Sequence, residues 1–333
     1  MGLITNKTEV LEIYEEAAQH KWVIPCICCE NLTTIEAVLA SVKEYGDKIG
    51  VNNLPITIAI TNCYEHRHQT INYTFSKNWE VGMRLFIEDL KILTSTYSPF
   101  KDLRVMLHLD HIQHDIDSSL LDWDMKQFSS IMFDASTLNF DENIIKTRKF
   151  VEQHSQDILI EGACDEIIDA GSGGNELTSP EKAERYMKET GCDFIVANLG
   201  TEHRASASEL KYHGDLAEKI KSKIGTKLVL HGASSVDPQQ ITNLFENGVC
   251  KVNIWTILER ESSSILFPMM LENASKILGS KQVVELQKQG LLGENISKNS
   301  EKSIKYYTTL YRQQIIFDEM KKIVAGYLNI WYI

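Results

Sequence analysis

Residues 103–111 end in two side chains that could carry out chemistry. The mostly apolar sequence LRVMLHL is followed directly by Asp110 and His111. A short run rich in Val and Leu is typical of a strand buried on both faces. A carboxylate and an imidazole at its end are costly to bury without partners. They could be a salt bridge that finishes the strand, or a proton acceptor beside a metal ligand.

Other apolar runs of the chain end in similar polar groups. Asp134 ends one run and Glu161 another, while His203 and His231 follow two more. Three neutral histidines can hold Zn²⁺ and leave a fourth position open for a substrate. The alternative is three unconnected histidines, each at the end of its own strand. Asp134 could hold one histidine ring through a hydrogen bond, or simply end its strand.

Eight apolar runs would have to position these groups. The expected strands are 22–29, 55–61, 104–110, 130–134, 158–161, 194–199, 227–231 and 249–254. The expected helices are 8–20, 33–45, 78–94, 144–154, 180–190, 210–224 and 238–247. Eight β–α units over about 260 residues favour a closed parallel barrel, with polar groups clustered where its strands end.

The domain organisation follows from the same alternation. An open sheet that binds a dinucleotide usually carries G-x-G-x-x-G after its first strand, and the chain has no such sequence. No linker rich in Pro, Gly or Ser divides it. We therefore expect one domain over 1–333: a (β/α)8 TIM barrel over about 1–260 and a helical extension over about 261–333, with a polar break at 293–302.

Composition narrows the classes of partner. The chain has 333 residues, 43% of them hydrophobic, and a formal net charge of −12, which argues against broad nucleic-acid binding. We expect no signal peptide, and the sequence contains no apolar run long enough to span a membrane. Its seven cysteines lie mostly in or beside apolar runs, the usage of reduced cysteines in a cytosolic protein.

The last two strand ends have a different character. Gly232 and Ser234 open one turn, and Asn253 and Thr256 open the next. Backbone N–H groups at a helix N-terminus, with small side chains and hydroxyls, suit a phosphate. Barrels often build a phosphate site from the loops after strands seven and eight. Plain helix capping by Ser234 and Thr256 is the simpler alternative.

Taken together, these motifs resemble the class II, zinc-dependent ketose-bisphosphate aldolases, which include the fructose-bisphosphate and tagatose-bisphosphate enzymes. The resemblance covers about residues 1–260. It is carried by HLDH, SIMFDAS, TSPEKA, TGCDFIVANLGTEH, LVLHGAS and VCKVNIWT, in this order. It implies reversible aldol cleavage of a phosphorylated ketose to dihydroxyacetone phosphate and an aldehyde, through a zinc-stabilised enediolate.

The resemblance also implies residue roles. Asp110 would carry the catalytic proton, and Glu176 would transfer a proton at the ketose carbon. One zinc ion per chain would be bound by three histidines, with Glu161 as a further candidate ligand. Phosphate would be held by the loops after strands seven and eight, with a monovalent cation near it. The three histidines are His111, His203 and His231, and the phosphate residues are Gly232, Ser234, Asn253 and Thr256. A cytoplasmic homodimer or homotetramer of carbohydrate metabolism, such as glycolysis, is expected.

The chain departs from the family pattern around the substrate. Arg204 replaces a glycine after His203, and Trp255 replaces a small residue before Thr256. Arg204 would need an anion, either on the substrate or in the Glu202 carboxylate. Two alternatives therefore stay open beside the aldolase: a zinc-dependent barrel lyase acting on a different ketose and aldehyde, and a metal-binding relative without turnover.

Overall fold

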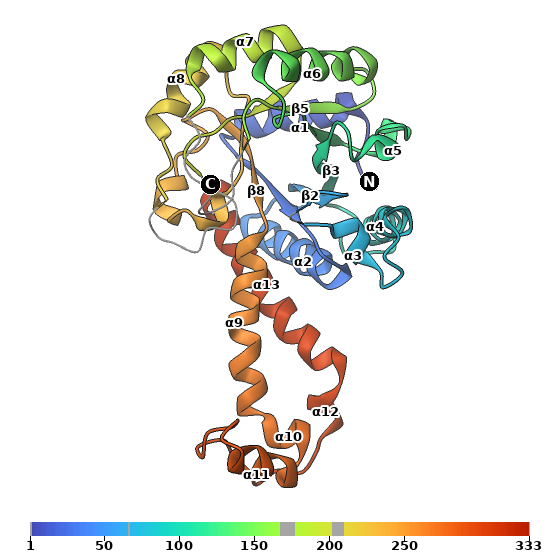
Figure 1. Cartoon of the computed structure of the whole chain (residues 1–333), viewed down its shortest axis with the longest axis vertical. Helices are drawn as coiled ribbons and strands as arrows, with labels where there is room; N and C mark the ends of the chain where they lie inside the picture. Colours follow the sequence, from blue (N-terminus) through green and yellow to red (C-terminus); the bar gives the residue numbers. More distant parts are fainter. Residues whose placement is uncertain (1, 66, 167–176, 202–209, 333) are drawn as a thin grey trace.

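Eight parallel strands close into a barrel in the computed structural model of the chain (Figure 1). The structure describes residues 2–65, 67–166, 177–201 and 210–332. Neighbours in the ring follow chain order, and β1 pairs with β8 to close it. The strands are β1 Ile24–Cys28, β2 Pro55–Thr61, β3 Arg104–Gln113, β4 Ser130–Asp134, β5 Leu159–Ala163, β6 Phe194–Val196, β7 Leu228–Leu230 and β8 Val249–Ile254. The predicted (β/α)8 barrel is thus confirmed.

One helix precedes the first strand, and further helices lie in the connections between strands. They are α1 Lys7–Gln19, α2 Leu32–Ile49, α3 Gln69–Tyr73, α4 Trp79–Leu93, α5 Ser118–Leu121, α6 Phe140–His154, α7 Pro180–Thr190 and α8 Gly214–Ile224. Short 3₁₀ turns lie at Met125–Gln127, Ala233–Ser235 and Pro238–Ile241. Each long helix buries one apolar stripe, as α4 does with Met83, Phe86 and Leu90.

Several sequence predictions about elements were wrong, and the largest error concerns 238–247. The helix expected over 238–247 is only the 3₁₀ turn Pro238–Ile241, followed by irregular turns. This segment contains Thr242, Asn243 and Asn247, which are weak helix formers, and its Asn247 side chain is hydrogen-bonded to Tyr212 and Glu218 instead. In addition, β3 does not end at Asp110 but continues to Gln113.

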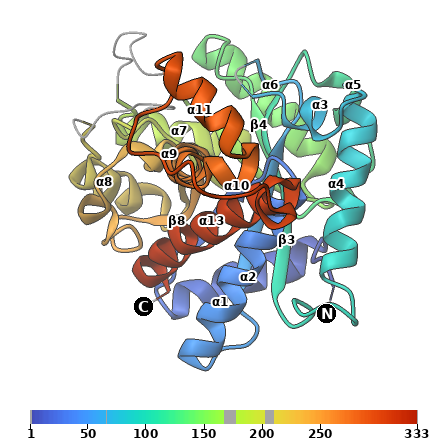
Figure 2. The same ribbon diagram turned by 90° about the horizontal axis from the view of Figure 1, so that it is seen from below.

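A helical arm formed by residues 256–331 projects from the barrel. It consists of α9 Thr256–Glu272, α10 Ala274–Leu278, α11 Ser280–Lys288, α12 Ile304–Tyr307 and α13 Thr309–Trp331. Figure 1 shows α9 leading away from the ring and α13 returning to it, and Figure 2 looks along this arm from below. We propose to treat barrel and arm as one domain, because α13 packs on α2 of the barrel.

The returning end of α13 is bonded to the first strands. The Val23 N–H donates to the Trp331 carbonyl (3.2 Å), and the Trp331 indole donates to the Ile241 carbonyl (3.1 Å). The hydroxyl of Tyr332 donates to the Pro55 carbonyl at the start of β2. No helix in the described part of the chain is long and apolar enough to cross a membrane.

Candidate metal and proton-transfer site

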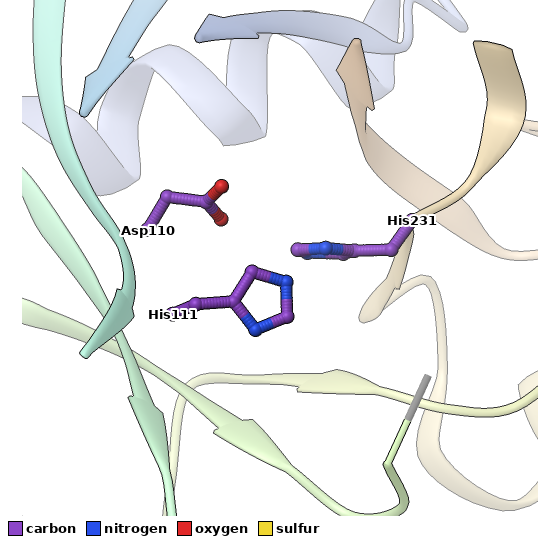
Figure 3. Close-up of side chains that lie close together, drawn as sticks. All are labelled: Asp110, His111 and His231. Atoms are coloured by element: carbon purple, nitrogen blue, oxygen red, sulfur yellow. The ribbon is translucent and has the colours of Figure 1, made fainter. Parts of the chain in front are cut away.

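Asp110, His111 and His231 meet at the carboxyl ends of β3 and β7 (Figure 3). Their ligand atoms all lie within 4.8 Å of one another, and all three residues are buried. The rings of His111 and His231 are nearly perpendicular, with centroids 5.0 Å apart. Two of the three predicted histidines and the predicted proton carrier therefore share one site. His203, Arg204 and Glu176 lie outside the described residues.

A backbone irregularity in β3 places neighbouring residues in the same site. Successive side chains of a regular strand point to opposite faces, so Asp110 and His111 should diverge. However, His111 has a φ of 49°, in the left-handed region, and the pairing of β3 with β4 shifts register between Leu109 and Ile112. Such an irregularity re-aims a side chain at the cost of some backbone strain.

Two contacts fix the orientation of the His111 ring. Its Nδ1 lies 3.1 Å from Oδ2 of Asp134, and the Tyr64 ring stacks on it with centroids 4.6 Å apart. Burial alone would raise the pKa of Asp134, but its hydrogen bond to His111 and its two from Ser136 lower that pKa. The ionised carboxylate therefore accepts the Nδ1 proton, and in a neutral ring this leaves the lone pair on Nε2. Asp134 holds the ring and also ends its strand, so both sequence interpretations apply.

The Asp110 carboxylate is surrounded by donors. Arg67 Nη2 lies 2.6 Å and the Cys28 thiol 3.2 Å from Oδ2, while Asn253 Nδ2 donates to Oδ1 at 2.9 Å. Burial alone would raise the pKa of this carboxyl, but nearby His111, Arg67 and His231 hold it well below its usual range. Asp110 is therefore ionised and available to accept a proton.

Glu161 belongs to a buried cluster that adjoins the site through His108, whose Nε2 lies 3.8 Å from Asp110 Oδ1 and 3.7 Å from Glu161 Oε2. Its Oε1 lies 2.5 Å from Lys251 Nζ, which also lies 3.2 Å from Nε2 of His108. Burial alone would lower the pKa of Lys251, but Cys26 and Glu161 raise it. The protonated Lys251 is therefore a counter-ion for Glu161, and we leave Glu161 out of the proposed ligand set.

The candidate phosphate residues adjoin this site. Gly232 has a φ of 71°, which a glycine adopts easily, and it precedes the 3₁₀ turn that contains Ser234. The Trp255 N–H donates to the Ser234 hydroxyl at 3.4 Å, and Thr256 is the first residue of α9. No side chain of its own caps the start of α9. Its backbone N–H groups therefore suit an anion.

The sequence did not predict four residues of the site and its surroundings, namely Arg67, Cys28, Tyr64 and Lys251. Arg67 and Tyr64 lie in the loop after β2, and loops at the carboxyl ends of barrel strands are where functional residues gather. That rule could have drawn attention to the polar stretch 62–68. Cys28 and Lys251 lie within apolar runs, where sequence alone does not show that the interior of this barrel is polar.

Glu259, a half-buried carboxylate in α9, provides a prediction about pH. Its Oε1 has no hydrogen-bond partner among the described residues, and burial, with the Glu30 carboxylate, raises the pKa of Glu259 from 4.5 to about 7. Ionising Glu259 therefore costs the folded state more than the unfolded state. The free energy of unfolding therefore falls as the pH rises from about 4.5, where Glu259 ionises in the unfolded chain, to about 7, where it ionises in the folded protein.

We expect Glu259→Gln to remove this loss. The free energy of unfolding of the variant, relative to the unsubstituted chain, should increase between pH 5 and pH 8 by about 3 kcal/mol at most. Urea unfolding at both pH values measures the difference. Glu261→Gln, on a half-exposed side chain of the same helix, is the control and should show no such change. The prediction would be contradicted if the free energy of unfolding of Glu259→Gln differed from that of the unsubstituted chain by the same amount at both pH values.

Comparison with known proteins identifies a family and a shared fold. A family model described as fructose-bisphosphate aldolase class-II matches residues 8–325. A crystal structure of fructose-bisphosphate aldolase from Campylobacter jejuni superposes with a TM-score of 0.76 at 19% identity, covering 99% of this chain and 95% of that chain. The YdjI aldolase from Escherichia coli K12 gives 0.65 at 16% identity, covering 99% and 97%. At such identities the two structures establish a shared fold.

Proposed function

Because the chain belongs to the class II fructose-bisphosphate aldolase family, whose members are carbon–carbon lyases that use a divalent metal, we propose that it cleaves a phosphorylated ketose reversibly. The products are dihydroxyacetone phosphate and an aldehyde. One observation carries this proposal: a buried carboxylate and two buried histidines converge at the carboxyl end of the barrel. A proton acceptor beside metal-binding nitrogens is what aldol cleavage needs.

The donor set fits one zinc ion per chain. His111 and His231 would hold it with His203, because neutral imidazoles are suitable zinc ligands and Asp134 fixes the tautomer of His111. Bound zinc supplies Lewis-acid polarisation of the ketose carbonyl. Asp110 accepts and returns the proton of the reacting hydroxyl, and Glu176 handles the proton at the ketose carbon.

The loops after β7 and β8 would hold the substrate phosphate. Gly232, Ser234 and Thr256 provide a glycine turn, a hydroxyl and the start of α9. Asn253, which donates to Asp110, connects this cradle with the proton carrier. Arg204 would bind an anionic group of the substrate. A monovalent cation would bind near the phosphate. The protein would act as a homodimer or homotetramer in cytoplasmic ketose-phosphate metabolism.

A panel of substrates tests the function. The metal content of the purified protein is measured, and cleavage of fructose 1,6-bisphosphate, tagatose 1,6-bisphosphate and ketose monophosphates is followed by enzymatic reduction of the dihydroxyacetone phosphate released. Activity that is lost with a chelator and restored by zinc supports the proposal. A zinc-loaded protein that neither cleaves any of these nor exchanges protons of dihydroxyacetone phosphate would be the relative without turnover.

A second candidate keeps the chemistry but changes the substrate. Arg67 and Trp255 lie in contact beside Asp110, with the guanidinium carbon 4.7 Å from the ring centroid. These two large side chains lie next to the proton carrier, and they favour a zinc-dependent lyase with a different ketose and aldehyde. Cleavage of a ketose monophosphate, without cleavage of either bisphosphate, would select this candidate.

A further inference from the structure

The loop after β2 holds the backbone of Arg67 at the mouth of the barrel. At the end of β2, the Thr61 hydroxyl donates to the Arg67 carbonyl, and the Gln69 N–H donates to that carbonyl at 3.0 Å. The Gln69 side chain in turn accepts from the Thr61 N–H at 2.8 Å and donates to Glu30 at 2.7 Å. These bonds fix where the Arg67 side chain starts.

The Arg67 side chain is nearly buried and lies between Trp255 and Asp110. It is 12% exposed, its guanidinium stacks on the Trp255 ring, and its Nη2 is 2.6 Å from Asp110 Oδ2. A stacked guanidinium is held in one plane, which a flexible ammonium would not be. The direction of the bond to Asp110 is therefore set by Trp255 as well as by charge.

Arg67 and Asn253 together hold both oxygens of Asp110. Arg67 binds Oδ2 and Asn253 binds Oδ1. A carboxylate bound at both oxygens from two different strand ends cannot rotate without breaking a charge-assisted bond. Without Arg67, the buried Asp110 would lose the charge-assisted bond to Oδ2, and the weak thiol donor of Cys28 would remain at 3.2 Å from that oxygen.

We propose that Arg67 is a positioning residue for the proton carrier: stacked on Trp255, it holds the Asp110 carboxylate in the orientation that faces His111 and His231. This inference rests on the proposed function, because the proton-transfer role of Asp110 is part of it. Arg67 acts through Asp110 and does not itself take part in proton transfer. Two other roles, a purely structural ion pair and a subsite for a substrate anion, predict different kinetics.

The kinetic test compares Arg67→Ala and Arg67→Lys with the unsubstituted protein on its best ketose phosphate. Misplacing a catalytic group by about 1 Å can cost 10²-fold, so kcat should fall roughly 10- to 100-fold in Arg67→Ala, with KM changed less than about threefold. Guanidinium chloride should restore part of kcat in Arg67→Ala, because the guanidinium ion can occupy the space beside Trp255. It should not raise the kcat of Asp110→Asn. Arg67→Lys should retain more activity than Arg67→Ala and less than the unsubstituted protein.

The matched control is Arg84→Ala. Arg84 also stacks on a tryptophan, with its guanidinium carbon 4.6 Å from the Trp123 ring centroid, and pairs with Glu80, but it lies exposed on α4. The Arg84→Ala substitution should leave kcat and KM unchanged. A raised KM with unchanged kcat in Arg67→Ala would overturn the proposal in favour of an anion subsite. Lower stability with unchanged kinetics would overturn it in favour of a structural pair.

A double-mutant cycle tests the same contact without turnover. The unfolding equilibrium constants of the unsubstituted protein, Arg67→Lys, Asp110→Asn and the double variant are compared in urea. Positioning of Asp110 by Arg67 requires the double variant to differ at least about threefold from the product of the single effects; additive effects would overturn it. If no ketose phosphate is cleaved, the proposed function fails, while this cycle still decides whether Arg67 is energetically coupled to Asp110, which the positioning role requires.

Discussion

Replacing His231 by alanine is expected to produce a folded barrel that no longer retains zinc. Losing only an outer hydrogen-bond partner of a metal ligand typically lowers metal affinity 10- to 100-fold. Losing a ligand itself should therefore cost more than about 100-fold, and turnover should fall with it. The barrel should survive, because His231 follows β7 at the carboxyl end, where side chains serve function more than stability.

Metal content after gel filtration, together with circular dichroism, measures this outcome. His203→Ala should behave in the same way. Asp134→Asn should show the smaller loss of metal affinity that is typical of removing an outer hydrogen-bond partner. His154→Ala changes a histidine of α6 and should retain all the zinc. Full metal retention in His231→Ala would remove that residue from the ligand set.

The second large effect is expected at Asp110. Asp110→Asn should keep fold and metal but lower turnover by about 10²-fold or more, the usual size of a lost general base. Asparagine keeps an oxygen that can accept from Arg67, so the loop after β2 should stay in place. The rate of ketose-phosphate cleavage and the metal content are measured on the same preparation.

Proton exchange separates the two proposed proton carriers. Exchange of the carbon-bound protons of dihydroxyacetone phosphate with D₂O is followed by NMR in Asp110→Asn and in Glu176→Gln. We expect Glu176→Gln to lower the rate of this exchange. We expect Asp110→Asn to lower the rate of cleavage by at least the same factor. If Asp110→Asn left both cleavage and exchange undiminished, another group would be the base.

The sequence predicted the barrel well because its strands are local features. Each strand is a short apolar run, and strands buried on both faces need such runs regardless of what they contact. The bounds of β2, β4 and β8 agree with the apolar runs at 55–61, 130–134 and 249–254. Helix 238–247 was predicted from its position in the alternation rather than from strong helix formers, and it does not form.

The site was only partly predictable, for a different physical reason. Rules about strand ends identify Asp110 and His231, but they do not foresee the left-handed His111 that turns two neighbours into one site. Nor do they foresee Arg67, whose partner Asp110 is 43 residues away along the chain. Contacts of that kind depend on how strands are arranged around the ring, and no local pattern encodes them.

The return of α13 to the first strands has a consequence for synthesis on the ribosome. The hydroxyl of Tyr332 bonds to Pro55, 277 residues earlier. At typical elongation rates of 5–20 residues per second, that separation corresponds to roughly 15–55 s. For that time the face of α2 that α13 covers lacks its partner helix. Early termination a few residues before Trp331 should therefore reduce the yield of folded protein rather than the activity of what folds.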